Sequence, residues 1–319
     1  MQDNIIKEKN WLVGAGLMSA YYAKVLKAQK IAFTTIGRGE LSAEEYTKTT
    51  GEDVFLGGIN KALECSIPET AIVSVSLSEL ANVTCVLLNK GVKRILLEKP
   101  GGVNREELHI IDKVANHAEA DVRIAYNRRF YSSTLTAERL IKEDGGVTSF
   151  NFEFTEWLHL FKENEKFDGV DILICNSSHV MDMAFFLGGL PEIMNCFAKS
   201  IGIKFDDDST RIYSGAGISK IGALFSYQAN WNAPGRWSVE ILTRKRRFIF
   251  RPLEQLHIQK IGSVAIEKYH IDDTIDIEFK PGLYREVDAF FSGDGLERLP
   301  TVNEQLANYE YYHKIQQGE

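Results

Sequence analysis

Short apolar runs alternate with amphipathic segments over the first 126 residues of the chain. The apolar runs predict strands at residues 10–13, 31–36, 53–56, 71–76, 94–97 and 122–126. Apolar positions at helical spacing between them predict helices at residues 17–29, 42–50, 79–90 and 105–120. Strands that alternate with helices in this way indicate a parallel sheet with helices on both faces, the α/β class.

Two of these predicted helices carry end signals. Ser42 is followed three residues later by Glu45, which predicts an N-cap at Ser42. Gly91 follows the helix at 79–90 and predicts its C-terminal end. These signals fix the expected order of elements in the first part of the chain.

The pattern changes after about residue 126. A helix predicted at 132–143 is followed by eight strand-like stretches between residues 147 and 270, rich in aromatic and β-branched residues. One helix, 171–187, interrupts them, and helices at 284–292 and 303–316 close the chain. We therefore expect two domains: residues 1–123, and an α+β domain at 124–319 with a large, mostly antiparallel open sheet. The C-terminal helices could pack back on the first domain.

Composition narrows the range of partners. The chain has 319 residues and a formal net charge of -7, which argues against nucleic acid as a partner. Its apolar runs fall short of the ~20 residues of a membrane span, and its first ten residues are polar, so we expect no membrane association and a cytoplasmic location. The cysteines form no C-x-x-C pair, which predicts reduced thiols and no metal site; they are Cys65, Cys85, Cys175 and Cys196.

A glycine-rich turn lies directly between the first strand and the first helix. Gly14 permits a tight turn, and Gly16 lets the backbone approach a pyrophosphate. Leu17 and Met18 begin the helix whose N-terminal N–H groups would face that pyrophosphate. Ser19 stands where a third glycine or alanine is usual. Because strand, turn and helix occur in the required order, we interpret the segment as a Rossmann dinucleotide site, in preference to a pair of turn glycines without function.

The end of the second strand bears on the choice of cofactor. An acidic residue about 20 positions beyond the glycines would bind the ribose hydroxyl of NAD, but this chain has Gly37-Arg38-Gly39 there. A guanidinium can pair with a 2'-phosphate, so NADP is the preferred prediction and NAD the alternative. Arg38 could instead stack on adenine or be a solvated loop cation.

Glu98-Lys99-Pro100 ends the strand at 94–97. Because Pro100 restricts the residue before it, we expect Lys99 to be extended and to aim across the strand ends, where open α/β sheets bind ligands. A lysine there could exchange a proton as a general acid or base. A surface lysine that precedes a helix is the alternative. Ser76 and Glu98, at neighbouring strand ends, complete the predicted cofactor site together with Lys99.

Four segments occur in an order that resembles one enzyme family. They are Gly14-Ala15-Gly16-Leu17-Met18, Glu98-Lys99-Pro100, Tyr126-Asn127-Arg128-Arg129-Phe130 and Ser178-His179-Val180-Met181-Asp182. With the closing segment Tyr284-Arg285-Glu286-Val287-Asp288-Ala289-Phe290, they resemble the glucose–fructose oxidoreductase, inositol dehydrogenase and MocA-like (Gfo/Idh/MocA) family over nearly the whole chain.

The resemblance implies an NAD(P)-dependent oxidoreductase of two domains. It implies that Lys99 and His179 face the reacting carbinol and exchange its proton while hydride passes to or from the nicotinamide. The implied substrate is a sugar, a sugar nucleotide or a cyclitol. The implied assembly is a homodimer or homotetramer formed through the C-terminal sheet.

One position departs from the family pattern. Four residues before the histidine, family members usually carry an aspartate, one helical turn back on the same face. This chain has Cys175 there. Either Asn176 or Asp171 takes the polar role, or the substrate differs from a simple sugar, or catalysis is lost.

Other substrate contacts are predicted near the same site. Arg128 and Arg129 could pair with a substrate phosphate or carboxylate, or form salt bridges at the joint between the domains. Trp231 lies in a segment, residues 230–237, that mixes aromatic and polar groups; it suits a sugar and equally a packed hairpin. Cys175 and Asn176 complete the predicted substrate site.

Two functions therefore compete. The first is a dehydrogenase or reductase that acts on CH–OH groups, which the retention of Lys99 and His179 favours. The second is a regulator that binds the dinucleotide on the same scaffold without turnover, which Cys175 favours.

Overall fold

The computed structural model describes residues 6, 8–157, 171–200 and 211–319, and these form two compact units. The first unit comprises the described residues up to Asn127 together with Ile275–Leu306. The second comprises Arg128–Thr274, as far as it is described, and Ala307–Glu319. The units thus divide four residues beyond the expected boundary at 123, and residues 275–306 return to the first unit.

The first unit contains a parallel sheet of six strands. The strands lie in the order β3-β2-β1-β4-β5-β6 and span Val54–Leu56, Thr34–Gly37, Asn10–Val13, Thr70–Val73, Arg94–Glu98 and Asp121–Ala125. This is the Rossmann strand order: from β1, the strands β2 and β3 follow on one side, and β4, β5 and β6 follow on the other. The predicted α/β class of this region is confirmed.

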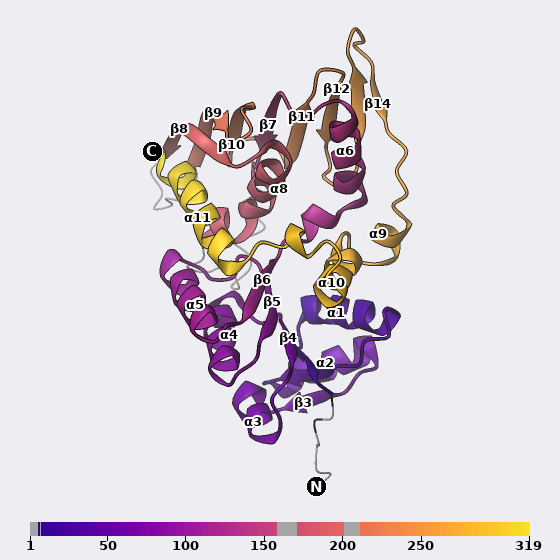
Figure 1. Ribbon diagram of the computed structural model, residues 1–319, viewed down its shortest axis with the longest axis vertical. Coiled ribbons are helices and arrows are strands. Elements are labelled where there is room, and N and C mark those ends of the chain that lie inside the picture. The colour runs from indigo at the N-terminus through magenta and orange to yellow at the C-terminus, as the bar shows by residue number, and fades with distance from the viewer. Residues whose placement is uncertain (1–5, 7, 158–170, 201–210) are drawn as a thin grey trace. The chain divides into compact units, whose positions relative to one another are not determined.

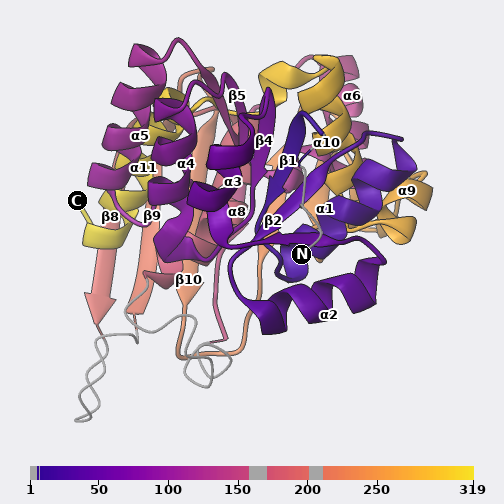
Figure 2. The same cartoon turned by 90° about the horizontal axis from the view of Figure 1, so that it is seen from below.

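Helices cover both faces of this sheet (Figures 1 and 2). Helix α1 contacts α2 and α10, and α4 contacts α5. These helices, with α3, span Leu17–Ala28 (α1), Glu40–Thr50 (α2), Gly58–Cys65 (α3), Leu80–Asn89 (α4), Arg105–His117 (α5) and Leu283–Ser292 (α10). The sequence patterns did not predict α3.

The predicted cap at Ser42 was wrong. Helix α2 begins at Glu40, and Gly39 is its N-cap. Ser42 lies inside the first turn, where its hydroxyl donates to the carbonyl oxygen of Gly39 at 3.0 Å instead of accepting from a backbone N–H. A serine near a helix start can bond the backbone in either sense, so Ser42 and Glu45 did not fix the first residue.

The second unit contains an eight-stranded sheet in the order β14-β13-β12-β11-β7-β10-β9-β8. In that order the strands span Ile266–Lys268, His257–Lys260, Arg246–Phe250, Ser238–Leu242, Ser149–Glu153, Leu224–Asn230, Arg211–Ser219 and Pro191–Ser200. Every neighbouring pair is antiparallel except β7 and β10. The predicted large, mostly antiparallel sheet is therefore confirmed.

Helices pack on one face of this sheet. They are α6 (Ser132–Glu143), α8 (Ser178–Gly188) with the π-turn Leu173–Ser177 before it, and the part of α11 (Val302–Gln317) from Ala307 onward. The ring of Phe185 on α8 packs edge-on against Phe150, Phe152 and Phe225 of the sheet. A short helix, α9 (Thr274–Glu278), follows the last strand.

Other strand residues of the second unit expose large apolar side chains. Ile193 is 56% exposed, Phe197 69% and Leu224 60%. The homo-oligomer expected through this sheet stays a prediction.

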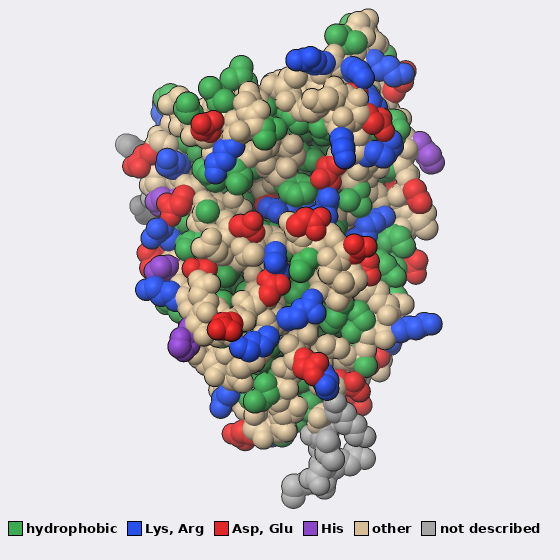
Figure 3. Space-filling model, in the orientation of Figure 1, with side chains coloured by type: hydrophobic (Ala, Val, Ile, Leu, Met, Phe, Trp, Pro, Cys, Tyr) green, Lys and Arg blue, Asp and Glu red, His purple; other side chains and the backbone are tan. Residues whose placement is uncertain are grey.

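Surface charge is mixed. On the face drawn in Figure 3, acidic and basic side chains are interspersed. Within the described part of the chain, every helix is too short or too polar to span a membrane.

Candidate active site

The glycine turn has the geometry that the sequence predicts. Gly14 has a φ of +124°, and a Cβ there would lie 2.0 Å from the carbonyl oxygen of Ser74, so a side chain is excluded. Ser19 is fully buried, and its hydroxyl donates to the same oxygen at 3.2 Å. The serine thus ties the start of α1 to the end of β4, where close packing by a small residue is required.

Gly16 differs from Gly14 because the space beside it is open. A Cβ there would meet no atom within 4 Å, and Gly16 is the N-cap of α1 without a side-chain cap. The first N–H groups of α1, at Leu17 and Met18, lack intrahelical partners, and the space beside Gly16 is open. Oriented N–H groups and the positive end of the helix dipole suit a pyrophosphate, so these residues fit a dinucleotide.

The strand order brings the other predicted cofactor residues to the same edge. β1 pairs with β2 and β4, and β4 pairs with β5, all in parallel register. Their carboxyl ends therefore carry, side by side, Arg38, the glycine turn, Ser76 and the Glu98-Lys99 pair. Ser76 is exposed beyond β4 and is the N-cap of a 3-10 turn at Leu77–Glu79.

Arg38 projects from the end of β2 into solvent. Its side chain is 79% exposed, and Nη1 lies 3.5 Å from Oε1 of Glu79. An exposed pair of this kind holds the guanidinium weakly, so a phosphate could compete for it.

Tyr22 links the partly buried Glu98 to a second, buried carboxyl group. The hydroxyl of Tyr22 lies 2.8 Å from Oε1 of Glu98 and 3.2 Å from Oε1 of Glu286, which is fully buried on α10. Burial raises the pKa of both carboxyl groups, and the charge of Glu98 raises the pKa of Glu286 further. The hydroxyl of Tyr22 has one proton, so it donates to one of the two carboxyl groups at a time.

The backbone on either side of Lys99 is held by hydrogen bonds. The amide of Gly101 donates to the carbonyl oxygen of Glu98 at 3.0 Å. The side-chain amide of Gln305 donates to the carbonyl oxygen of Pro100 at 3.0 Å. The Lys99–Pro100 peptide bond is cis, which the sequence did not predict. Lys99 is partly buried at the strand end that the sequence assigned to it.

In the second unit, His179 lies in the first turn of α8. Its side chain is 7% exposed, and its ring centroid is 6.2 Å from that of Trp237. The π-turn Leu173–Ser177 runs directly into this helix and contains both Cys175, which is buried, and Asn176. Turns of this type inside helices are frequent at functional sites.

A buried carboxylate, Glu156, binds the π-turn, and the sequence did not predict it. Its side chain is fully buried, and Oε1 accepts hydrogen bonds from Asn176 at 3.0 Å and Ser177 at 2.6 Å. Oε2 lies 3.1 Å from Nη1 of Arg236. Burial raises the pKa of Glu156, although the hydrogen bond from Ser177 and the charge of Arg236 oppose the shift. The π-turn is thus held by a buried acid that binds Ser177, two residues before His179.

The two residues offered as replacements for the missing aspartate behave differently. Asp171 accepts from the backbone amides of Leu173 and Ile174 at 2.9 and 3.3 Å, and it also binds Gln316. It therefore caps the start of the π-turn, as an N-terminal aspartate does. Asn176 instead binds Glu156, so among these two Asn176 is the one linked to the acid near His179.

The two predicted arginines have separate surroundings. Arg129 forms a two-point ion pair with Asp182, with Nε–Oδ2 at 2.9 Å and Nη2–Oδ1 at 2.5 Å; both side chains are buried. Arg129 therefore forms a salt bridge, which was the alternative to a substrate contact, and both partners belong to the second unit. The Arg128 guanidinium lies over the rings of Trp237, at 5.0 Å, and Tyr131, at 5.8 Å.

The predicted tryptophan is a packing residue in this structure. Trp231 is 8% exposed, its N–H donates to the carbonyl oxygen of Phe154 at 3.2 Å, and its ring packs edge-on against Tyr213. Trp237, six residues later, contacts His179 instead. The composition of residues 230–237 does not tell which of its two indoles contacts the histidine.

The fold is shared with solved structures of other proteins. No protein-family model and no curated protein sequence matches the chain. Solved structures do match: UDP-N-acetylglucosamine 3-dehydrogenase from Acidithiobacillus ferrooxidans has a TM-score of 0.72 at 15% identity and covers 97% of this chain and 96% of its own. Levoglucosan dehydrogenase, solved with NADH and levoglucosan, has a TM-score of 0.75 at 16% identity, with 98% and 97% covered.

An NAD-binding oxidoreductase from Klebsiella pneumoniae is similar as well. Its TM-score is 0.76 at 14% identity, with 98% of this chain and 96% of that chain covered. At such identities the likeness establishes the fold. The fold that the sequence resemblance implied, a Rossmann unit with an open-sheet unit, is thus confirmed.

Proposed function

We propose that the protein is an NAD(P)-dependent oxidoreductase that transfers hydride between the nicotinamide and a secondary alcohol or ketone of a sugar, sugar nucleotide or cyclitol. The observation that supports this proposal is the sheet edge where β1, β4 and β5 end, because the glycine turn follows β1 and Lys99 follows β5 at that edge. The likeness to levoglucosan dehydrogenase, whose structure holds NADH and a sugar, supports the same reading.

The dinucleotide would be held by the first unit. The N–H groups after Gly16 would bind the pyrophosphate, and Ser76 and Glu98 would line the path along the strand ends. When bound, the nicotinamide accepts or supplies the hydride. Gly14 and Ser19 keep the turn close to β4, which is a structural contribution to this cradle.

Lys99 and His179 are the proposed acid/base groups. Nζ of Lys99 or a ring nitrogen of His179 would take the hydroxyl proton of the alcohol and return it to the ketone. Gln305 fixes the backbone beside Lys99, and Trp237 packs against His179. Both side chains are at least partly withdrawn from water, which favours a defined geometry for proton transfer.

A substrate screen tests the enzyme reading. Sugars, sugar nucleotides and cyclitols are offered with each cofactor while the absorbance of the reduced nicotinamide is followed. We expect Lys99→Ala to lower turnover about 100-fold or more, the usual contribution of a general acid or base, without abolishing cofactor binding. Lys113→Ala, an exposed lysine on α5, is the matched control. Undiminished turnover in Lys99→Ala would refute the assigned role.

NADP is the proposed preference. Arg38 is an exposed cation at the end of β2, and its weak partner Glu79 leaves guanidinium N–H groups for a 2'-phosphate. We expect Arg38→Ala to weaken NADPH binding about tenfold, the value of one charge-assisted pair of roughly 1.4 kcal/mol, and to leave NADH binding almost unchanged. Isothermal titration with both cofactors checks this, with Arg244→Ala as control. Equal losses for the two cofactors would count against the preference.

A second candidate is a regulator that binds the dinucleotide without turnover. Cys175 favours it, because a buried thiol replaces a polar group one helical turn before His179. Glu156 weakens this candidate, since it supplies a carboxylate to the same π-turn. Tight cofactor binding without turnover on any screened compound would favour the regulator.

A further inference from the structure

Two arginines share one indole ring beside His179. The guanidinium carbon of Arg236 lies 4.4 Å from the centroid of Trp237, and that of Arg128 lies 5.0 Å from it. Tyr131 and Trp157 continue the stack, at 5.8 Å from Arg128 and 4.8 Å from Arg236. Aromatic rings hold the flat faces of guanidinium groups, and the N–H groups at their edges remain available for ligands.

The charges of this cluster do not balance. It contains three guanidinium groups, Arg128, Arg129 and Arg236, and the described residues pair two of them with buried carboxylates. Asp182 pairs with Arg129 and Glu156 with Arg236. Within the described part of the chain no carboxylate lies within ion-pair distance of Arg128, and its Nε is buried without a hydrogen-bond partner.

Arg128 is partly buried, and its charge also acts on Asp182, whose two oxygens already bind Arg129. The charge of Arg128 is therefore only partly compensated. A guanidinium cannot lose its proton, so burial cannot be relieved by neutralisation as it can for lysine. A donor that is removed from water and lacks a hydrogen-bond partner raises the free energy of the folded protein, and a bound acceptor would lower it again. Carboxylates and phosphates fit the fork of N–H groups in a guanidinium, and these oxyanions are its strongest partners.

We propose that Arg128, stacked on Trp237, binds an oxyanion of the substrate, with Arg236 as the second wall of the subsite. This inference rests on the proposed function, because Trp237 also packs against His179 at 6.2 Å. The substrate class is therefore an anionic sugar, with a carboxylate on the sugar or a phosphate attached to it. The shared chemistry is the oxyanion, and the experiment distinguishes its two sources.

Binding is measured by isothermal titration on the full chain with saturating NADP⁺, so that the dinucleotide site is occupied. The probes are D-glucuronate for a carboxylate, UDP for a phosphate, and D-glucose as the neutral reference. We expect one of the two anions to bind, and we expect Arg128→Gln to weaken it at least tenfold. Whichever anion binds identifies the source. Arg139→Gln, an exposed arginine of the same unit, is the matched control and should leave binding unchanged.

Arg128→Lys keeps the charge but loses the planar fork, and it serves also if Arg128→Gln does not fold. We expect it to weaken the anion several-fold, less than Arg128→Gln. The subsite is overturned if neither anion binds, or if the bound anion has the same affinity in both variants. Anion binding that depends on Arg128 without any turnover would leave the subsite standing and refute the enzyme. Turnover of neutral sugars that is unchanged in Arg128→Gln would support the enzyme and refute the subsite.

Discussion

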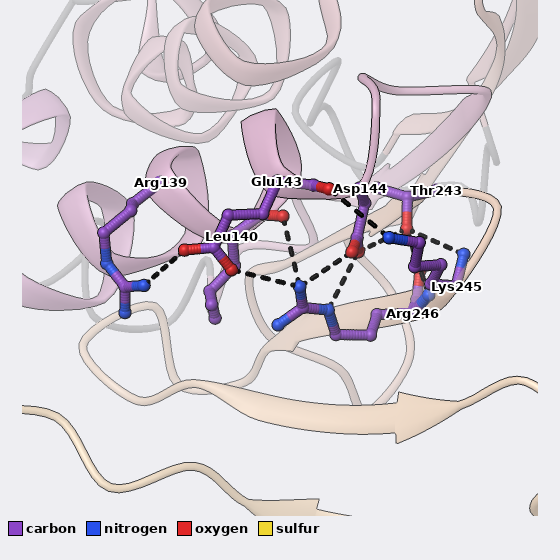
Figure 4. A network of polar contacts seen from close by, with 7 residues as sticks. All are labelled: Arg139, Leu140, Glu143, Asp144, Thr243, Lys245 and Arg246. Carbon is purple, nitrogen blue, oxygen red and sulfur yellow. Dashed lines mark hydrogen bonds and ion pairs between the residues drawn. The ribbon is translucent and has the colours of Figure 1, made fainter.

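Two buried carboxylates of the second unit, Asp144 and Glu156, both pair with an arginine, yet their pKa values shift in opposite directions. Hydrogen bonds from Arg246, at 2.9 and 2.7 Å, lower the pKa of Asp144 and outweigh the effect of its burial (Figure 4). Burial raises the pKa of Glu156 and outweighs its hydrogen bonds from Ser177 and Arg236. The fold favours the charged form of Asp144 and disfavours that of Glu156.

The partners of Asp144 all belong to the scaffold. Asp144 is the C-cap of α6, and Arg246 and Thr243 lie at the turn between β11 and β12. Arg246 also contacts the carbonyl oxygen of Leu140 and the carboxylate of Glu143 (Figure 4). A cation at a helix C-terminus is favourable in itself. This network therefore fastens a helix end to a hairpin.

The partners of Glu156 lead to the candidate active site. Asn176 and Ser177 precede His179, and Arg236 stacks on Trp237. Burial raises the pKa of Glu156, and residues with shifted pKa values are frequent at active sites. Glu156 is therefore a candidate for a functional role. From this contrast we propose that Asp144 serves stability and that Glu156 positions the π-turn before His179.

The largest expected effect is on the Asp144 side. Arg246→Gln leaves the buried carboxylate of Asp144 without its cation, so we expect the free energy of unfolding to fall by about 3 kcal/mol, the usual cost of breaking a buried pair. Urea unfolding at pH 7 measures it. Turnover and cofactor affinity of the folded fraction should not change.

Arg139→Gln is the matched control, because Arg139 pairs with Glu143 in the same network at 59% exposure. An exposed pair contributes less than about 0.5 kcal/mol, so this variant should unfold like the native chain. If both variants lost a similar free energy of unfolding, the buried pair of Arg246 and Asp144 would contribute no more than the exposed pair of Arg139 and Glu143.

A smaller effect lies in the pH dependence of stability. The pKa of Asp144 is lowered in the folded state, so its contribution is present above the unfolded value of about 3.9 and is lost as pH falls through the folded value. The pKa of Glu156 is raised, so stability falls as pH rises from the unfolded value of about 4.3 through the folded value. The two acids should therefore act in opposite senses.

Unfolding curves of the native chain, Asp144→Asn and Glu156→Gln between pH 3 and 7 separate these contributions. We expect the advantage of the native chain over Asp144→Asn to shrink at low pH, and its disadvantage against Glu156→Gln to grow toward pH 7, each by on the order of 1 kcal/mol. Parallel curves for all three proteins would show that neither acid has a shifted pKa.

Local patterns predicted much of the fold. The strand at Asn10–Val13 and the helix at Ser132–Glu143 lie where the patterns place them, because periodicity and flanking turns agree there. The glycine turn and the edge position of Lys99 followed from the strand–turn–helix order. Helix α3 was missed, since its start at Gly58 carries no cap signal.

The second half of the candidate site was less predictable. Glu156 reads as an ordinary polar residue after an aromatic strand, and its partners lie about 20 and 80 residues further on. Nothing local tells that Arg129 meets Asp182 while Arg128 stacks on Trp237. Contacts of this kind depend on the packing of α8 on its sheet, which single residues do not encode.

The most direct test of the contrast is to compare Glu156→Gln and Asp144→Asn, whose amides imitate the protonated acids. Unfolding free energy at pH 7 and kcat/KM on the substrate found by the screen are measured for both. We predict that Asp144→Asn loses about 2 kcal/mol of stability with kcat/KM intact. We predict that Glu156→Gln is at least as stable as the native chain at pH 7, by up to about 1 kcal/mol, and loses kcat/KM about tenfold. Loss of stability in Glu156→Gln with full kcat/KM would contradict the account.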